Sequence, residues 1–113
     1  VQTILKDVVP VGQDSVIAPI DIINAVASYY KFNADDLYGS SRVQAVALAR
    51  QIAMYLCREQ TNLSLPKIGQ LFGGRDHTTV MYATKKISAQ MRERRYIYNQ
   101  VSEIIQKIKD DNK

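Results

Sequence analysis

A run of four polar residues, 76–79 (Asp-His-Thr-Thr), directly follows a glycine pair and an arginine, and its side chains could read the base edges of duplex DNA. A carboxylate can accept a hydrogen bond from cytosine N4, and an imidazole can donate or accept at a base edge. A threonine offers a hydroxyl group and a methyl group that can contact the thymine methyl. Reading of this kind places the first turn of a helix in the major groove, so the helix that carries residues 76–79 must be examined next.

The residues after this run have the periodicity of an amphipathic helix that extends from His77 to about Arg92. At about 100° per residue, one face of this helix is apolar and should be buried; it holds Val80, Ala83, Ile87 and Met91. The opposite face holds Thr78, Tyr82, Lys85, Lys86 and Ala89, with Thr79 at its edge. The first turn would therefore present hydrogen-bonding groups and the middle would present two lysines, which favours a helix that lies on DNA.

The residues around the start of this helix also have simpler interpretations. Asp76 can cap the helix, and His77 considered alone is more simply a solvent-exposed side chain. Gly73 and Gly74 can form a turn that needs positive φ, and the same glycines would let the backbone pass close to a phosphate. Arg75, at the positive end of the helix, is placed to meet a phosphate.

A second candidate contact comes from a different part of the chain. Arg42 follows Gly39-Ser40-Ser41, a sequence that can form an extended loop. An arginine on such a loop could enter a minor groove. Considered in isolation, Arg42 is more simply a surface residue.

The surrounding pattern predicts an all-α domain, a bundle of about six helices without strands. Ser64 is a candidate N-cap for a short helix over 65–72, which the turn 73–76 joins to the helix 77–92 as a helix-turn-helix. The other helices are predicted over 20–31, between Asn33 and Gly39, over 43–60, and up to about Lys109 with Val101, Ile104, Ile105 and Ile108 as its apolar stripe.

The helix predicted over 43–60 is apolar over most of its circumference, which is typical of the central helix of a bundle. Its polar exceptions are Arg50, Gln51 and Arg58. We expect these three side chains to reach a common exposed edge or end of the bundle, because an unpaired charge is costly to bury.

The distribution of charge favours a polyanionic partner. The 113 residues carry a net charge of +4. Residues 42–95 have ten Lys and Arg against three Asp and Glu, a net charge of +7, whereas residues 1–41 have two against five, a net charge of −3. A segment this basic is typical of a nucleic-acid-binding surface, and a solvated basic surface without a partner is the alternative.

Composition disfavours several other classes of protein. No apolar stretch is long enough for a membrane span and no signal peptide is visible, so we expect a cytoplasmic location, with Cys57 as a buried thiol in a reducing compartment. One His and one Cys are too few for a metal site, and no glycine-rich phosphate loop is present. We therefore expect no catalytic residue, metal or cofactor in this domain. The alternative that remains is a basic helical protein-interaction domain that binds an acidic partner.

Taken together, these residues resemble the signature of the bacterial chromosomal replication initiator family, DnaA. The matching motifs are Ile68-Gly69, the run 72–80 (FGGRDHTTV) and Lys86-Ile87, with 49–56 (ARQIAMYL) and 64–66 (SLP) upstream. The resemblance covers about residues 18–110 and implies the DNA-binding domain at the C-terminal end of that family. It also implies that residues 1–17 are a remnant of the lid of a preceding ATPase domain plus a linker, and that the full-length protein binds ATP.

The resemblance further implies an asymmetric short site in origin DNA, the DnaA box, that is read in both grooves. At the matching positions, Arg42 would be the minor-groove arginine. Major-groove base contacts are implied for Asp76, His77 and Thr78, and packing on thymine methyl groups for Leu65 and Pro66. Contacts to the DNA backbone are implied for Arg50, Gln51, Arg58, Thr61, Arg75, Thr79 and Lys86, and Lys85 beside them is expected to contribute.

Three positions depart from the pattern of this family. The loop around Arg42 is less basic than usual, which predicts weaker minor-groove affinity. Tyr82 replaces a common His, and Gln60 stands where an apolar residue is usual, but neither lies within the residues that match the signature. No long apolar heptad seam is available for dimerisation, so we expect a monomer that binds one box per chain and has no ATPase activity.

Overall fold

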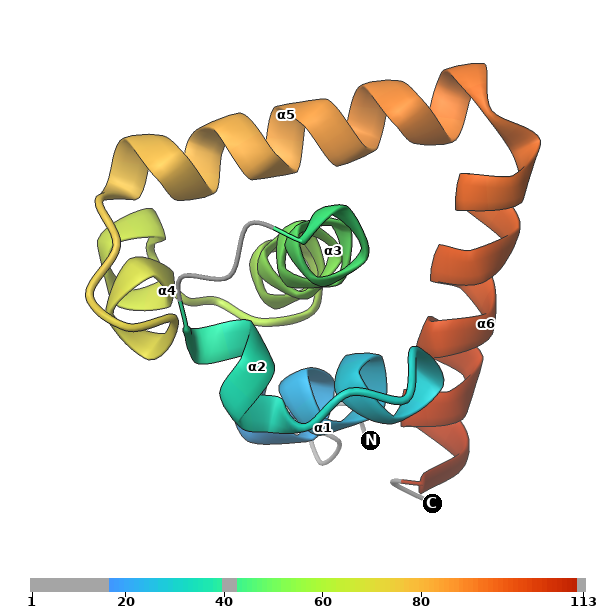
Figure 1. Cartoon of the computed structure of the whole chain (residues 1–113), viewed down its shortest axis with the longest axis horizontal. Helices are drawn as coiled ribbons and strands as arrows, with labels where there is room; N and C mark the ends of the chain where they lie inside the picture. Colours follow the sequence, from blue (N-terminus) through green and yellow to red (C-terminus); the bar gives the residue numbers. More distant parts are fainter. Residues whose placement is uncertain (1–16, 40–42, 112–113) are drawn as a thin grey trace, which may run out of the picture.

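The computed structural model describes residues 17–39 and 43–111, and these residues form six helices joined by short connections (Figure 1). In chain order the helices are α1 (Pro19–Tyr29), α2 (Ala34–Tyr38), α3 (Gln44–Gln60), α4 (Leu65–Leu71), α5 (His77–Glu93) and α6 (Arg95–Asp111). No strand occurs in the described residues, so the predicted all-α class and the predicted number of helices are confirmed.

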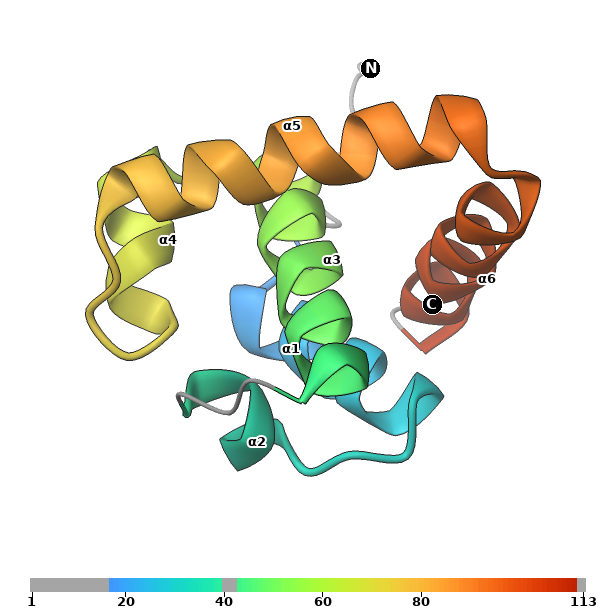
Figure 2. The ribbon, with the colours of Figure 1, turned by 45° about the horizontal axis from the view of Figure 1, so that its top comes forward.

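Helix α3 lies at the centre of the fold. Figure 1 shows α3 end-on, with α5 above it, α1 below it, and α4 and α6 on its two sides. Figure 2 shows that α5 crosses over α3. The side chains of α3 are buried on most of its circumference, at Val46, Ala49, Arg50, Ile52, Ala53, Met54, Leu56 and Cys57. The predicted central position is therefore confirmed, since neighbouring helices must cover a helix that is apolar nearly all round.

Helix α1 ends two residues earlier than its apolar pattern predicts. Lys31 adopts the left-handed region with φ 63°, and the amide of Phe32 donates to the carbonyl of Ala27 at 2.7 Å. A left-handed residue with a hydrogen bond back over the last turn closes a helix. The chain then reverses into α2, and the predicted N-cap Asn33 is confirmed. The backbone amide of Asn33 donates to the carboxylate of Asp36 at 3.0 Å.

Helix α6 closes the bundle against α1. Its predicted stripe is confirmed, because Val101, Ile104 and Ile108 are buried, whereas Ile105 is half-buried. Polar contacts join the two helices at their rim, where the hydroxyl of Tyr30 donates to the side chain of Gln100 at 2.7 Å and Tyr29 donates to Glu103. The hydrogen bond to Glu103 is the main reason that the pKa of Tyr29 rises to about 12, and burial raises the pKa of Tyr30 to about 12.

Cys57 is a core residue of α3, as the sequence predicts. Its side chain is fully buried, and burial raises the pKa of the thiol to about 12. The thiolate is the reactive form of cysteine, so this residue is chemically inert in the folded domain.

Among the described residues, no helix combines the length and the apolar character that crossing a membrane requires.

Candidate nucleic-acid interface

The helix-turn-helix consists of α4, a tight turn and α5, and its corner depends on close backbone contact. Ser64 caps α4 as predicted, because its hydroxyl accepts a hydrogen bond from the amide of Lys67 at 3.3 Å. The amide of Arg75 then donates to the carbonyl of Gly69 at 2.8 Å, so the chain after the turn lies directly on α4. A Cβ atom on Gly69 would lie 2.1 Å from the carbonyl oxygen of Arg75, which shows that only glycine permits this approach.

The turn itself uses the predicted backbone conformation of its glycine pair. Gly73 has φ 84° and Gly74 has φ 79°, so both occupy the left-handed region that favours glycine. Gly73 also lies against α2, since a Cβ atom there would stand 2.7 Å from the carbonyl oxygen of Tyr38. The ring of Tyr38 packs beside that of Phe72, with centroids 6.4 Å apart. The end of α2 therefore supports the turn of the helix-turn-helix.

The first turn of α5 presents polar side chains to solvent. Asp76, His77, Thr78 and Thr79 are all exposed, while Val80 behind them is fully buried. Asp76 occupies the predicted N-cap position, and its carboxylate contacts the side chains of Thr78 and His77. The hydroxyl of Thr78 donates to Oδ2 of Asp76 at 3.0 Å, and Nδ1 of His77 lies 2.9 Å from Oδ1. The three residues expected to contact bases thus form one connected group.

These contacts further favour the charged form of Asp76. The hydrogen bond from Thr78, with a smaller effect from His77, lowers the pKa of the Asp76 carboxyl below its ordinary value of 3.8. Like any exposed aspartate, Asp76 is ionised at neutral pH, and its carboxylate acts only as a hydrogen-bond acceptor. An acceptor at this position suits the amino group of a cytosine.

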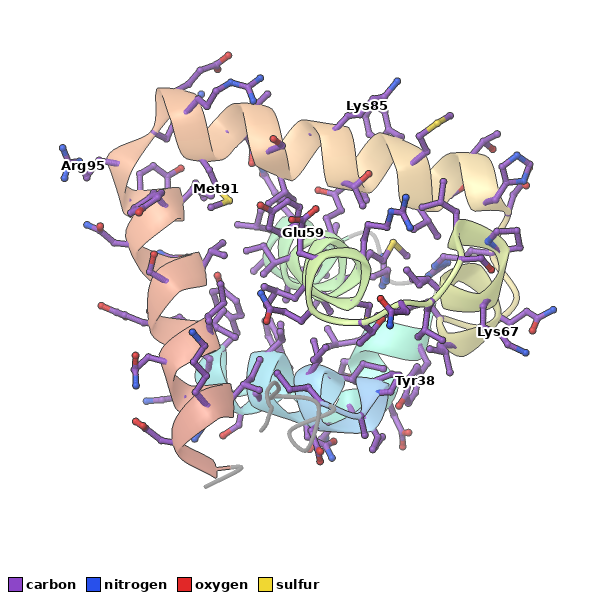
Figure 3. All side chains as sticks on the ribbon, turned by 180° about the vertical axis from the view of Figure 1, so that it is seen from behind. Tyr38, Glu59, Lys67, Lys85, Met91 and Arg95 are labelled. Carbon is purple, nitrogen blue, oxygen red and sulfur yellow. The ribbon has the colours of Figure 1, made fainter. Side chains whose placement is uncertain are left out.

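The two faces of α5 agree with its sequence periodicity. Val80, Ala83 and Ile87 are buried and Met91 is half-buried, whereas Thr78, Tyr82 and Lys85 are exposed and Lys86 and Ala89 are half-buried. Tyr82 is 62% exposed on the outer face of α5. Figure 3 shows Lys85 projecting from the outer side of α5, away from the bundle, and Lys67 projecting from the outer edge of α4.

Arg50 does not reach the exposed edge that the sequence predicts, so this expectation is wrong. Only 9% of its surface is exposed, and its guanidinium lies under the C-terminal end of α2. Nε donates to the carbonyl of Leu37 at 3.0 Å, and Nη2 donates to the carbonyl of Asp36 at 3.5 Å. The last carbonyls of a helix have no partner within it, and this is why a buried arginine is stable here.

Arg75 is bound to the same end of α2. Its Nη2 donates to the carbonyl of Gly39, and the side chain is half-buried. Its Nε is buried without a hydrogen-bond partner among the described residues. Burial lowers the pKa of Arg50, and the positive charge of Arg75 lowers it further. Two guanidinium groups therefore join the helix-turn-helix and α3 to the end of α2, directly before residues 40–42.

Gln51 and Arg58 belong to α3, and Thr61 is its C-cap residue. Gln51 is half-buried and Arg58 is exposed, with Nη1 of Arg58 donating to the carbonyl of Leu63 at 3.4 Å. The hydroxyl of Thr61 donates to the carbonyl of Cys57 and accepts from the amide of Leu63 at 3.2 Å. Thr61 therefore shapes the end of α3 with the same hydroxyl that was expected to approach a phosphate.

Comparison with known proteins identifies the family. The family model described as "Bacterial dnaA protein helix-turn-helix" matches residues 19–87, from the start of α1 to the middle of α5. The chain belongs to this family. Residues 88–113, which include the end of α5 and all of α6, lie outside the matched region.

Relatives from the same family match the whole chain or nearly all of it. It is 69% identical over 113 residues, all of this chain, to the chromosomal replication initiator protein DnaA of Clavibacter sepedonicus. It is 70% identical over 113 residues to that of Leifsonia xyli subsp. xyli, and 57% identical over 108 residues, 96% of this chain, to that of Cutibacterium acnes. The aligned chain spans 24% of the first two relatives and 22% of the third.

The expected contact residues differ in their exposure. The exposed residues are Arg58, Pro66, Asp76, His77, Thr78, Thr79 and Lys85. The half-buried residues are Gln51, Thr61, Leu65, Arg75 and Lys86, and Arg50 is buried. Arg42 lies outside the described residues. No cluster of three or more His, Cys, Asp or Glu side chains that could hold a metal ion occurs within residues 17–39 and 43–111.

Proposed function

We propose that this chain is the sequence-specific DNA-binding domain of a chromosomal replication initiator, and that it binds DnaA boxes at the replication origin. The observation that carries the proposal is the connected group of Asp76, His77 and Thr78, which is exposed at the first turn of α5. Its position above a rigid helix-turn-helix corner suits insertion into a major groove. The family match and the names of the relatives support the same function.

In this proposal, the polar group at the start of α5 reads the bases. Asp76 accepts from a cytosine amino group, and the hydrogen bond from Thr78 and the contact with His77 hold its carboxylate in place beforehand. Thr78 presents its methyl group to a thymine, and Leu65 and Pro66 at the start of α4 pack on further thymine methyl groups. A pre-positioned polar group loses less conformational entropy on binding, which favours specificity.

Phosphate contacts orient the domain on the duplex and carry no sequence information. Thr79, Lys85 and Lys86 would approach one side of the groove, and Gln51, Arg58 and Thr61 would approach the backbone from α3. Arg42, on the loop before α3, would enter the adjacent minor groove. Arg50 and Arg75 already bind carbonyls at the C-terminal end of α2. In this proposal they therefore also hold in place the end of α2, from which the loop with Arg42 starts.

The proposal extends to the whole protein and its location. The protein is expected in the bacterial cytoplasm, at the nucleoid, and the full-length protein is expected to bind ATP through a part that precedes this domain.

The isolated domain itself should be a monomer that binds one asymmetric box per chain. Analytical ultracentrifugation with a single-box duplex would measure this stoichiometry, and an obligate dimer on a palindrome would contradict it.

A fluorescence-anisotropy titration tests the proposed reading. The domain should bind a duplex with one DnaA box more tightly than a scrambled duplex at every salt concentration. Thr78→Ala should weaken binding to the box by about 1–3 kcal/mol and relax the preference at one or two base pairs. Lys86→Ala should weaken binding to both duplexes alike and lower the slope of log affinity against log salt concentration by about one unit.

Two outcomes would decide against base reading. Equal loss on both duplexes in Thr78→Ala would remove Thr78 from the base-reading residues. Equal binding of box and scrambled duplex by the unaltered domain would favour a basic protein-interaction domain instead. Thr78→Ser separates the two roles of Thr78, since it keeps the hydroxyl group that holds Asp76 and removes only the methyl group that is proposed to contact a thymine.

A further inference from the structure

A polar pocket of about 210 Å³ opens where the first turns of α3 face the corner between α5 and α6. This corner lies outside residues 19–87, which the family match covers. Three elements contribute polar side chains to the pocket: Gln44, Gln51, Lys86, Gln90, Arg94 and Tyr96. None of the described residues that line it is acidic.

Two members of this pocket link it to the proposed DNA interface. Gln51 on α3 and Lys86 on α5 are among the residues that are proposed to face the DNA backbone. Lys86 and Gln90 are four residues apart and lie on one side of α5, and Arg94, the C-cap residue of α5, follows four residues later. At a rise of 1.5 Å per residue, Arg94 lies about 12 Å beyond Lys86. A DNA strand that passes Lys86 would therefore meet the pocket where α5 leaves the groove.

The chemistry of the pocket suits a phosphodiester group. Arg94 is exposed at the end of α5, and its guanidinium can donate two parallel hydrogen bonds to phosphate oxygens. Tyr96, which is 54% exposed, and the exposed Gln44 supply further donors from α6 and α3. Lys86 adds a second positive charge. The pocket is large enough for a phosphate and carries no carboxylate from the described residues to repel it.

We propose that this pocket binds a phosphate of the bound duplex, with Arg94 as the principal contact and Tyr96 and Gln44 as its neighbours. The inference rests on the proposed function, and it adds a contact beyond the helix-turn-helix itself. The domain would then hold one DNA strand from Lys86 to the α5–α6 corner. Such a contact lengthens the footprint on flanking DNA and adds affinity without adding base specificity.

The adjacent arginine provides a matched control. Arg95 has the same charge and is also exposed, but it lines a different pocket with Met91, Arg92 and Tyr98. Figure 3 shows Arg95 pointing outward from the corner, away from the bundle. Arg94→Ala and Arg95→Ala change the net charge of the domain equally, so long-range electrostatic attraction to DNA changes equally in both. Only a local phosphate contact distinguishes the two variants.

The experiment measures affinity for box and scrambled duplexes over a range of salt concentrations. Arg94→Ala should weaken both duplexes by roughly 3- to 10-fold at 0.1 M salt and lower the salt slope by about 0.9. Arg95→Ala should leave the slope near that of the unaltered domain, and Arg94→Lys should keep most of it. Circular dichroism melting curves should be unchanged, because both side chains are exposed.

Ethylation interference gives a second readout at the level of single phosphates. One phosphate should be sensitive to ethylation with the unaltered domain and insensitive with Arg94→Ala. Equal effects of Arg94→Ala and Arg95→Ala, or the same interference pattern in both, would overturn the pocket assignment while the preference for the box stands. Loss of that preference in the unaltered domain would instead overturn the proposed function, and with it this inference.

Discussion

A methyl group added at Gly69 should disrupt the corner of the helix-turn-helix. In Gly69→Ala, the new Cβ atom would lie 2.1 Å from the carbonyl oxygen of Arg75, and real Cβ contacts are almost never shorter than 3.0 Å. The start of α5 would have to move away from α4 by roughly 1 Å, because neither backbone atom can rotate out of the way. The hydrogen bond from the Arg75 amide to the Gly69 carbonyl, now 2.8 Å, would lengthen as a result.

The free energy of unfolding should fall by about 3 kcal/mol. Overpacking against backbone costs about 3 kcal/mol, at the upper end of the usual range, and the weakened hydrogen bond costs about 1 kcal/mol. The greater helix propensity of alanine offsets about 1 kcal/mol of this loss. For a domain of this size, the melting temperature should fall by roughly 10–20 °C. Circular dichroism melting and urea titration would measure both quantities.

Gly39→Ala is the matched control for this substitution. A Cβ atom at Gly39 would meet the carbonyl oxygen of Asp35 at 3.6 Å, which is ordinary van der Waals contact. Its φ of −76° is accessible to alanine, so the stability should change by less than about 0.5 kcal/mol. A Gly69→Ala domain that is as stable as the Gly39→Ala domain would refute the argument that this close approach holds the corner.

Three further predictions concern residues in other parts of the fold. Arg50→Ala should lower the free energy of unfolding by about 1–3 kcal/mol in urea titrations, because it leaves the carbonyls at the end of α2 unpaired. The control Arg58→Ala should change it by less than about 0.5 kcal/mol, and equal effects of the two substitutions would contradict the buried position of Arg50. Arg42→Ala should weaken binding to the box without changing the melting temperature. A G·C pair at the minor-groove position of Arg42 should likewise weaken binding of the box by the unaltered domain. Unchanged affinity in both tests would make Arg42 an ordinary surface residue. Stability should fall as the pH rises above 9, because the Cys57 thiol ionises near pH 9 when unfolded but only at about 12 when folded. Tyr30 adds to this fall above pH 10, so Cys57→Ala should flatten the curve of urea midpoint against pH between 9 and 10, and an unchanged slope would show that Cys57 is not responsible.

Local patterns in the sequence were sufficient for the helices and for the two faces of α5. A helix places each side chain according to its residue number alone, so the spacing of Val80, Ala83 and Ile87 identified the buried face. Ser64 and Asn33 marked two helix starts, and the glycine pair 73–74 marked the turn, because each depends on its own backbone and nearest neighbours. The family motif then assigned roles to the exposed residues, and these assignments remain predictions.

The tertiary structure alone decided the position of Arg50, the close approach at Gly69 and the pocket beside Arg94. Nothing near Arg50 in the sequence indicates that α2, whose Leu37 lies 13 residues earlier, supplies the carbonyls that make its burial stable. Arg75 binds Gly39, which is 36 residues away, and the pocket joins the start of α3 to the start of α6. A helical pattern describes which side of one helix is apolar, but the burial of a charge or the shape of a pocket depends on which distant segment packs against that side.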